Sequence, residues 1–178
     1  MRKIQTIPLV ALLVICFCFV QCHKDKSPSP DNPYGLPNAT QTGIGFLACR
    51  INGLNFIGVR KFPFTKGAVL NADTLYVDGE PATGRYFEII SIAIKGNLQQ
   101  GSTYKVDSIT SLAFYSSDSS CNGISSQVVN SYSKTGAIKL TKFDTTDKIV
   151  SGTFYFDFPI SDCDTLHVTE GRFDYHYY

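Results

Sequence analysis

Thiol groups are the side chains of this sequence whose positions predict chemistry most clearly. The chain has six cysteines, and Cys22 stands where an apolar run, Ile7–Val20, gives way to the charged stretch His23–Lys26. Arg2 and Lys3 precede the run. A basic start, an apolar stretch and a cysteine at its end follow one another in bacterial lipoprotein signal peptides. We therefore predict that residues 1–21 are removed and that the Cys22 sulfur is acylated.

The apolar run has two other interpretations. A transmembrane helix needs roughly 20 apolar residues, whereas this run has about 14, so removal is favoured over retention. Cys16 and Cys18 also lie in the run, and Gln21 is not the small residue usual before a lipidated cysteine. Cys22 remains the predicted site because hydrophobicity ends there. Palmitate and further acyl chains on Cys22 would anchor the protein in the outer membrane, facing the periplasm or the cell surface.

Three cysteines follow Cys22, and export would place them in an oxidising compartment. Cys49 alternates in phase with Leu47 and Ile51, which predicts a buried, inert thiol. Cys121 and Cys163 both lie in polar loops. Of the three pairings that three cysteines permit, we predict a disulfide between Cys121 and Cys163. Closing this loop of about 42 residues could contribute roughly 4 kcal/mol in the chain-entropy model.

Catalytic chemistry has few candidate residues. His23 lies near the N-terminus, while His167 and His176 share strand phase with polar residues and are expected to face solvent. No Gly-x-Ser-x-Gly elbow is present, and a Ser-His-Asp arrangement could form only in three dimensions. With only three glutamates, no pair of carboxylates suggests glycosidase chemistry. We predict a non-enzymatic protein without catalytic residues or a cofactor.

Metal binding is not indicated either. The spacings Cys-x-x-Cys and Cys-x-x-His, typical of zinc sites, do not occur. Asp144 and Asp147 lie in one turn, and Asp162 and Asp164 in another, but neither pair follows the EF-hand pattern. Aspartate is common in turns because its side chain accepts hydrogen bonds from the local backbone. We predict no metal site.

Charge and composition define the domain organisation. Without Arg2 and Lys3, 14 Lys and Arg face 15 Asp and Glu, so no basic field is available for nucleic acid. Four prolines between residues 23 and 38, with almost no apolar residues, predict an extended, solvated segment. We assign residues 22–41 to the lipidated cysteine and its tether, and residues 42–178 to one domain.

Hydrophobicity in the predicted domain alternates with a period of two, which indicates strands with one buried face. Ile90, Ile92 and Ile94 share one face, and Asn52-Gly53 is a strong hairpin signal. We predict an antiparallel β-sandwich of about nine or ten strands, with a closed barrel as second choice. The candidate strand segments are 45–51, 54–60, 75–77, 86–95, 103–106, 112–115, 127–132, 137–143, 149–158, 165–169 and 172–177.

Five short motifs, taken in order, carry a resemblance to a known family. They are Leu36-Pro-Asn-Ala-Thr-Gln-Thr-Gly43, Asn52-Gly53, Leu140-Thr-Lys-Phe-Asp144, Ile149-Val-Ser-Gly-Thr-Phe-Tyr-Phe156 and Glu170-Gly-Arg-Phe-Asp174. This set resembles a family of small outer-membrane lipoproteins that is classified as a domain of unknown function. The resemblance implies an exported, all-β protein. It implies no particular activity.

Two functions fit these observations. The first is a lipid-anchored interaction or accessory lipoprotein with an unidentified partner, in which exposed tyrosines are scattered. The second is a glycan-binding module, in which several tyrosines gather in one concave patch with polar neighbours. Tyr155, Tyr175 and Tyr177 are the candidate glycan contacts, with Tyr132 and Tyr178 as further members. The absence of Trp counts against the second function.

Overall fold

The computed structural model describes residues 32–59, 67–81, 87–107, 109–118, 129–160 and 164–178. The predicted signal peptide, the predicted lipid site Cys22 and the predicted disulfide partners Cys121 and Cys163 lie outside these residues. The chain divides into two compact units, Met1–Gly35 and Leu36–Tyr178, and the strands belong to the second. Within the described residues, no helix has the length and apolar character needed to cross a membrane.

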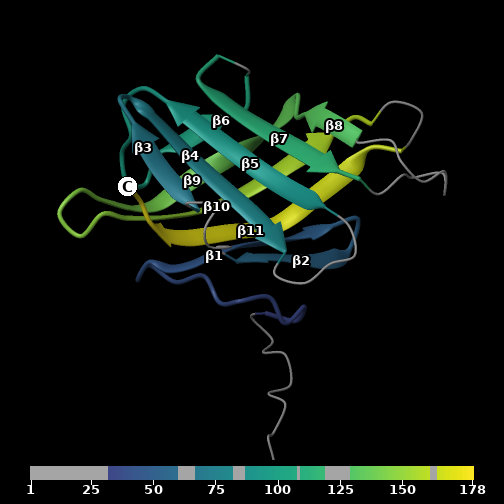
Figure 1. The fold of residues 1–178 in the computed structure, drawn as a ribbon, viewed down its shortest axis with the longest axis horizontal. Coiled ribbons are helices and arrows are strands. Elements are labelled where there is room, and N and C mark those ends of the chain that lie inside the picture. The colour runs from purple at the N-terminus through teal and green to yellow at the C-terminus, as the bar shows by residue number, and fades with distance from the viewer. Residues whose placement is uncertain (1–31, 60–66, 82–86, 108, 119–128, 161–163) are drawn as a thin grey trace, which may run out of the picture. The chain divides into compact units, whose positions relative to one another are not determined.

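Eleven antiparallel strands form one curled sheet (Figure 1). The sheet order is β6-β9-β10-β11-β1-β2-β4-β5-β7-β8, with β3 paired to β4. The strands are β1 (Ile44–Ile51), β2 (Leu54–Val59), β3 (Ala68–Asn71), β4 (Thr74–Pro81), β5 (Glu88–Lys95), β6 (Thr103–Lys105), β7 (Ser111–Ser117), β8 (Val129–Tyr132), β9 (Thr135–Asp144), β10 (Ile149–Phe158) and β11 (Leu166–His176). The predicted all-β antiparallel fold is confirmed. The two layers expected of a sandwich are the two halves of a single sheet that curls into a half-barrel.

The two halves join where β2 meets β4, at a seam only two residue pairs long. Gly58 and Gly79 make this sharp fold sterically allowed. A Cβ on Gly58 would lie 2.8 Å from the Gly79 Cα, and a Cβ on Gly79 would lie 2.8 Å from the Cβ of Leu47. Because neither residue has a side chain, the sheet can fold back over its own core at this corner.

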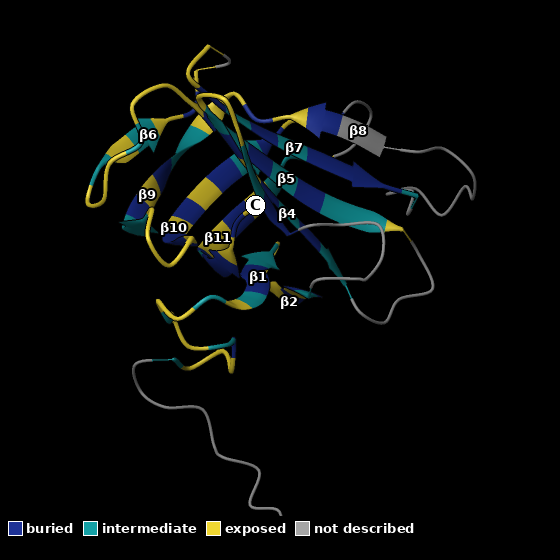
Figure 2. Cartoon of the chain, turned by 60° about the vertical axis from the view of Figure 1, so that its left-hand side comes forward, coloured by how far each residue is buried: buried dark blue, intermediate teal, exposed yellow. Residues whose placement is uncertain are grey.

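The hydrophobic core fills the space enclosed by the curled sheet. Buried residues alternate with exposed or partly exposed ones over residues 152–158 of β10 and 138–140 of β9 (Figure 2), as the period of two predicted. Each buried Phe, Leu or Ile side chain contributes about 1.5–3 kcal/mol relative to an exposed one. The largest fully buried side chains are Tyr175, Phe156, Phe158, Phe173, Leu47, Leu75, Ile90, Ile92, Ile94, Ile138, Leu140 and Val77.

Apart from shifts of strand ends, such as β4 at Thr74–Pro81 where 75–77 is predicted, the predicted strands differ from the observed ones in two places. The segment 68–71, which has no recognisable alternation, forms β3 as the partner of β4. The segments 165–169 and 172–177, predicted as two strands, are one strand, β11. The predicted hairpin turn at Asn52-Gly53 is confirmed, because both residues have positive φ, 47° and 83°.

A fully buried carboxylate, that of Asp174 on β11, holds the start of the domain against the outer face of the sheet. Its Oδ2 accepts hydrogen bonds from the Thr40 hydroxyl at 2.6 Å and the Thr42 N–H at 3.0 Å. Its Oδ1 accepts from the Gly43 N–H at 2.8 Å and the Ser151 hydroxyl at 2.7 Å. The carboxylate therefore connects three separate segments of the chain.

These contacts place the start of the structured domain earlier than predicted. Leu36 is buried and forms a small apolar cluster with Phe46 and Ala48 on β1. The prediction that the tether extends to residue 41 rests on the prolines and the scarcity of apolar residues between positions 23 and 38. Thr40 is instead a hydrogen-bond donor to Asp174, so this segment belongs to the folded unit, which begins at Leu36.

The ionisation of Asp174 reflects two opposing influences. Burial, the largest, raises its pKa, but hydrogen bonds from Thr40, Ser151, Gly43 and Thr42 outweigh burial and hold the pKa below its usual range. A carboxylate with a lowered pKa stabilises the folded state above its unfolded pKa, about 3.9. This contribution is lost as the pH falls through the lowered pKa of the folded protein.

We expect Asp174→Asn to lower the free energy of unfolding by about 3 kcal/mol at neutral pH. In either orientation the amide would turn its NH₂ group toward donors that now meet a carboxylate oxygen. Urea denaturation followed by circular dichroism measures the effect, with Asp147→Asn, at an exposed residue, as the control. Equal stability of the two variants would show that Asp174 does not hold the domain together.

Candidate functional site

The outer face of β6, β9, β10 and β11 presents polar side chains in lateral register. Thr103 lies opposite Lys139, Lys139 opposite Thr153, and Thr153 opposite Arg172. Lys139 and Thr153 are exposed, as is Thr103, whereas Arg172 is partly covered. In the next row, Ala137 lies opposite both Lys105 and Tyr155. The alternation of these strands thus brings side chains from four segments onto one surface.

A β-bulge interrupts β11 beside Tyr155. Phe154 pairs with Gly171 and Phe156 with Val168, so Tyr155 faces two residues of β11, Thr169 and Glu170, instead of one. Glu170 adopts a left-handed conformation, with φ of 54°, which is uncommon for a residue other than glycine. Bulges and strained residues concentrate at functional sites, where they redirect side chains.

Two reciprocal contacts between glycine and phenylalanine hold β10 and β11 beneath the bulge. Gly152 pairs with Phe173, and a Cβ on Gly152 would lie 2.5 Å from the Phe173 ring. Gly171 pairs with Phe154, and a Cβ there would lie 2.4 Å from that ring. An aromatic ring that covers a glycine of the neighbouring strand fixes the register of both strands. The surface around Tyr155 is therefore built on a rigid support.

A hollow of about 520 Å³ lies on this surface, and we call it the Tyr155 groove. This volume falls within the range of small-ligand sites, roughly 300–1,000 Å³. Tyr155, 58% exposed, is its large aromatic side chain. The short side chains of Ala137 and Thr153 lie between the long side chains of Lys139 and Tyr155, and the hollow lies above them. The lining residues are Ala39, Thr103, Ala137, Lys139, Thr153, Phe154, Tyr155, Glu170, Gly171 and Arg172.

The charged groups of the groove are not equivalent. Arg172 Nη2 lies 3.4 Å from Glu170 Oε2, and Arg172 Nη1 donates to the Pro37 carbonyl at 3.3 Å. These contacts hold the guanidinium in place. Within the described part of the chain, Lys139 Nζ and the Tyr155 hydroxyl have no hydrogen-bond or ion-pair partner. Both groups are available to a ligand.

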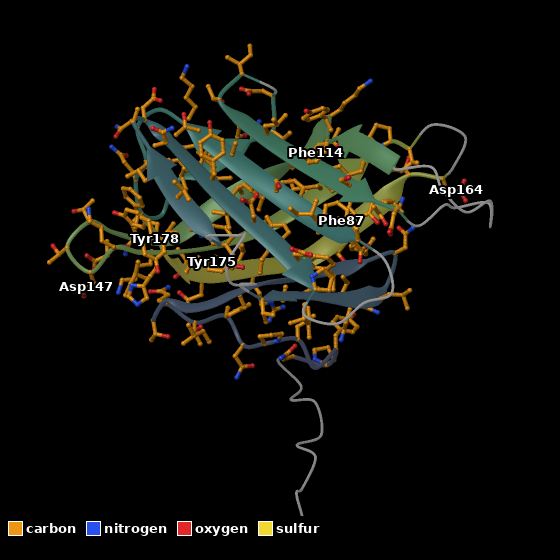
Figure 3. The ribbon with its side chains drawn as sticks, in the orientation of Figure 1. Phe87, Phe114, Asp147, Asp164, Tyr175 and Tyr178 are labelled. Atoms are coloured by element: carbon orange, nitrogen blue, oxygen red, sulfur yellow. The ribbon has the colours of Figure 1, made fainter. Side chains whose placement is uncertain are left out.

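Of the three candidate glycan contacts, Tyr155 alone lies in the groove. Tyr175 and Tyr177 are 1% and 3% exposed and belong to the core, so they cannot form an exposed platform with Tyr155. The Tyr175 hydroxyl donates to the Asp78 carbonyl at 3.0 Å, and burial raises the Tyr175 pKa. Tyr175 and Tyr178 lie toward the same end of the molecule as Asp147 (Figure 3).

The prediction for Tyr175 and Tyr177 was wrong because it conflicts with the period of two: His176, expected to face solvent, lies between them in the same strand. The β-bulge sets which face of this part of β11 points inward. Val168 faces the core, and uninterrupted alternation would place residues 174 and 176 inside and residues 175 and 177 outside. The additional residue at Glu170 shifts the phase by one, so Gly171, Phe173 and Tyr175 face the core instead. In the sequence, Glu170-Gly171 separates the two predicted strand segments 165–169 and 172–177, whereas in the structure it is a bulge within β11.

The two histidines among the described residues, His167 and His176, lie on the surface, as predicted. His167 has a side chain 63% exposed, and its Nδ1 lies 2.7 Å from Asp157 Oδ1. The hydrogen bond from His167 is the main cause that lowers the Asp157 pKa. The Thr135 hydroxyl donates to Asp157, not to His167, so these three residues do not follow the order nucleophile, base, carboxylate.

The other residues considered for chemistry, Cys49 and Asp144, are engaged in the core and in a turn, respectively. Cys49 carries a free, fully buried thiol, as predicted, and burial raises its pKa. Asp144 Oδ1 accepts hydrogen bonds from the N–H groups of Thr146 and Asp147, at 2.9 and 3.0 Å, and so caps its own turn. Among the residues that the structure describes, no three His, Cys, Asp or Glu side chains converge as a metal site would require.

We expect Glu170→Val to unfold more readily than Glu170→Gly, by about 1–2 kcal/mol. Both variants lose the contact with Arg172, but only valine must adopt the left-handed conformation with a branched Cβ. Chemical denaturation compares the two variants, and Thr169→Val, at the exposed neighbour without positive φ, should change stability little. If the valine and glycine variants at position 170 were equally stable, the bulge would not be strained.

Comparison with known proteins identifies a family for this chain. Residues 65–175, more than half of the chain, match the family model described as Domain of unknown function (DUF6252). The matched region contains the bulge, Asp174 and almost all of the groove. No curated protein and no solved structure matches the chain. The protein therefore belongs to the DUF6252 family.

Proposed function

We propose that this protein is a lipid-anchored lipoprotein of the outer membrane or cell surface, and that its β-domain is a non-enzymatic interaction module. The order of basic residues, apolar run and Cys22 supports export and acylation. The proline-rich segment that follows would hold the domain away from the membrane surface. The folded unit that begins at Leu36 would then be displayed to a partner.

The Tyr155 groove is the proposed binding site of this module. One observation carries the proposal: an exposed tyrosine stands opposite a strained glutamate at a bulge, inside a hollow of ligand size. Tyrosine is a frequent binding hot spot because it offers a rigid, amphipathic surface. Strands supply these side chains, so little ordering is needed when a ligand binds.

The distribution of exposed tyrosines supports an interaction module over a polysaccharide platform. Among the described residues of the domain, they are Tyr76 on β4, Tyr132 on β8, Tyr155 on β10 and Tyr178 after β11. They come from separate strands and do not gather in the groove. The second candidate, glycan binding, is therefore restricted to a small site with one tyrosine. The polar side chains next to Tyr155 are the observation that favours glycan binding as this second candidate function.

Cys22→Ser should abolish incorporation of labelled palmitate in a bacterium with a lipoprotein pathway, because serine offers no sulfur for acylation. The variant should also leave the membrane fraction, since the acyl chains supply its anchoring energy. Cys18→Ser, inside the apolar run, is the matched control and should label normally. Normal labelling of the Cys22 variant would disprove acylation at this residue.

Tyr155→Ala should weaken ligand binding about tenfold, because loss of an aromatic hot spot commonly costs more than 1 kcal/mol. The test is a glycan array probed with the detergent-solubilised mature protein. Tyr132→Ala is a matched control, since Tyr132 is 57% exposed and lies on β8, outside the groove. Array signals that are the same for both variants would remove the groove from the proposed function.

A further inference from the structure

The Tyr155 groove has an excess of positive charge. Its lining includes two cations, Lys139 and Arg172, and one anion, Glu170. Arg172 already faces Glu170 at 3.4 Å, so the charge of this pair is largely compensated internally. Lys139 has no such partner among the described residues. Lys105, exposed on the neighbouring row, adds a further positive charge to the same face.

The strand register places Lys139 beside the aromatic ring. Lys139 lies opposite Thr153, two residues from Tyr155 on β10. Such diagonal neighbours on adjacent strands are about 7–8 Å apart at their backbones, which is within reach of long side chains. A ring that stacks on Tyr155 would extend over the short side chains of Thr153 and Ala137. Its substituents would then come within reach of the Lys139 ammonium group.

These groups complement an anionic saccharide. The C–H face of a sugar ring is apolar and stacks on an aromatic ring, while its hydroxyls need both donors and acceptors. Glu170 offers acceptor oxygens, and Thr153 offers a hydroxyl that can donate or accept. The free Lys139 ammonium would pair with a carboxylate or sulfate on the sugar. We infer that the Tyr155 groove binds a saccharide unit that carries a negative charge, an inference that rests on the proposed function.

The experiment compares three probes that differ in charge. They are oligogalacturonate, which carries carboxylates, the same oligosaccharide as its neutral methyl ester, and a sulfated galactan oligosaccharide. Calorimetry on the detergent-solubilised mature protein measures their affinities. Oligogalacturonate should bind about fivefold tighter than its methyl ester, the ratio expected of one solvent-exposed ion pair. Higher ionic strength should reduce this ratio by screening. The sulfated probe shows whether sulfate can replace carboxylate.

Two variants separate charge from stacking. Lys139→Gln should reduce the affinity for oligogalacturonate to that for the methyl ester, without weakening the ester. Lys95→Gln, at an exposed lysine on β5, is the matched control and should preserve the fivefold ratio. Tyr155→Ala should weaken the binding of both probes. Circular dichroism shows that each variant is folded.

The outcomes distinguish this inference from the proposed function. Equal affinity for the charged and neutral probes, or an unchanged ratio in Lys139→Gln, would overturn the inference and leave a glycan-binding groove. No binding of any of the three probes would also overturn it. If array signals that depend on Tyr155 persisted in that case, the proposed function would stand with a different ligand. If no signal depended on Tyr155, both would fail.

Discussion

The buried carboxylate of Asp174 is the interaction on which the arrangement of this domain depends. A fully buried carboxylate is costly unless hydrogen bonds replace its hydration. Asp174, on β11, meets this requirement through Thr40 and Gly43, in the segment that leads into β1, and through Ser151 on β10. Satisfying one group thus fixes the position of three segments. The small apolar cluster of Leu36, Phe46 and Ala48 forms on the same side as a consequence.

The additional residue at Glu170 connects the core to the proposed site. By shifting the phase of β11, it turns Phe173 and Tyr175 into the core and leaves Glu170 at the surface opposite Tyr155. The paired contacts of Gly152 with Phe173 and of Gly171 with Phe154 then fix this register. Without the additional residue, Phe173 and Tyr175 would face solvent and Arg172 would face the core. The fold and the groove therefore share one structural cause.

The alternation of apolar residues was sufficient to predict most of the strands, the Asn52-Gly53 turn and the burial of Cys49. These features depend on neighbours in sequence, whose period is visible directly. Two expectations were wrong, and only the first depended on a contact distant in sequence. Thr40 has the appearance of a linker residue until Asp174, on β11, lies beside it. Tyr175 and Tyr177 alternate with His176, so the expected exposure of His176 and a period of two together place both tyrosines in the core. The Glu170 bulge is the structural feature that sets this phase. Side chains from four strands line the groove, so no single segment of the sequence predicts it.

A site with one tyrosine and one unpaired lysine would bind a single saccharide unit weakly, since neither group is deeply buried. Weak binding is compatible with the proposed anchoring. Many copies confined to one membrane would meet a polymeric ligand with repeated units, and each bound unit raises the effective concentration of the next site. The total affinity would then depend on the density of the anchored protein and on the reach of its proline-rich segment, more than on the contacts of one groove. On this argument, the lipid anchor would be a functional part of the binding site, because release from the membrane would remove the avidity that a shallow groove requires.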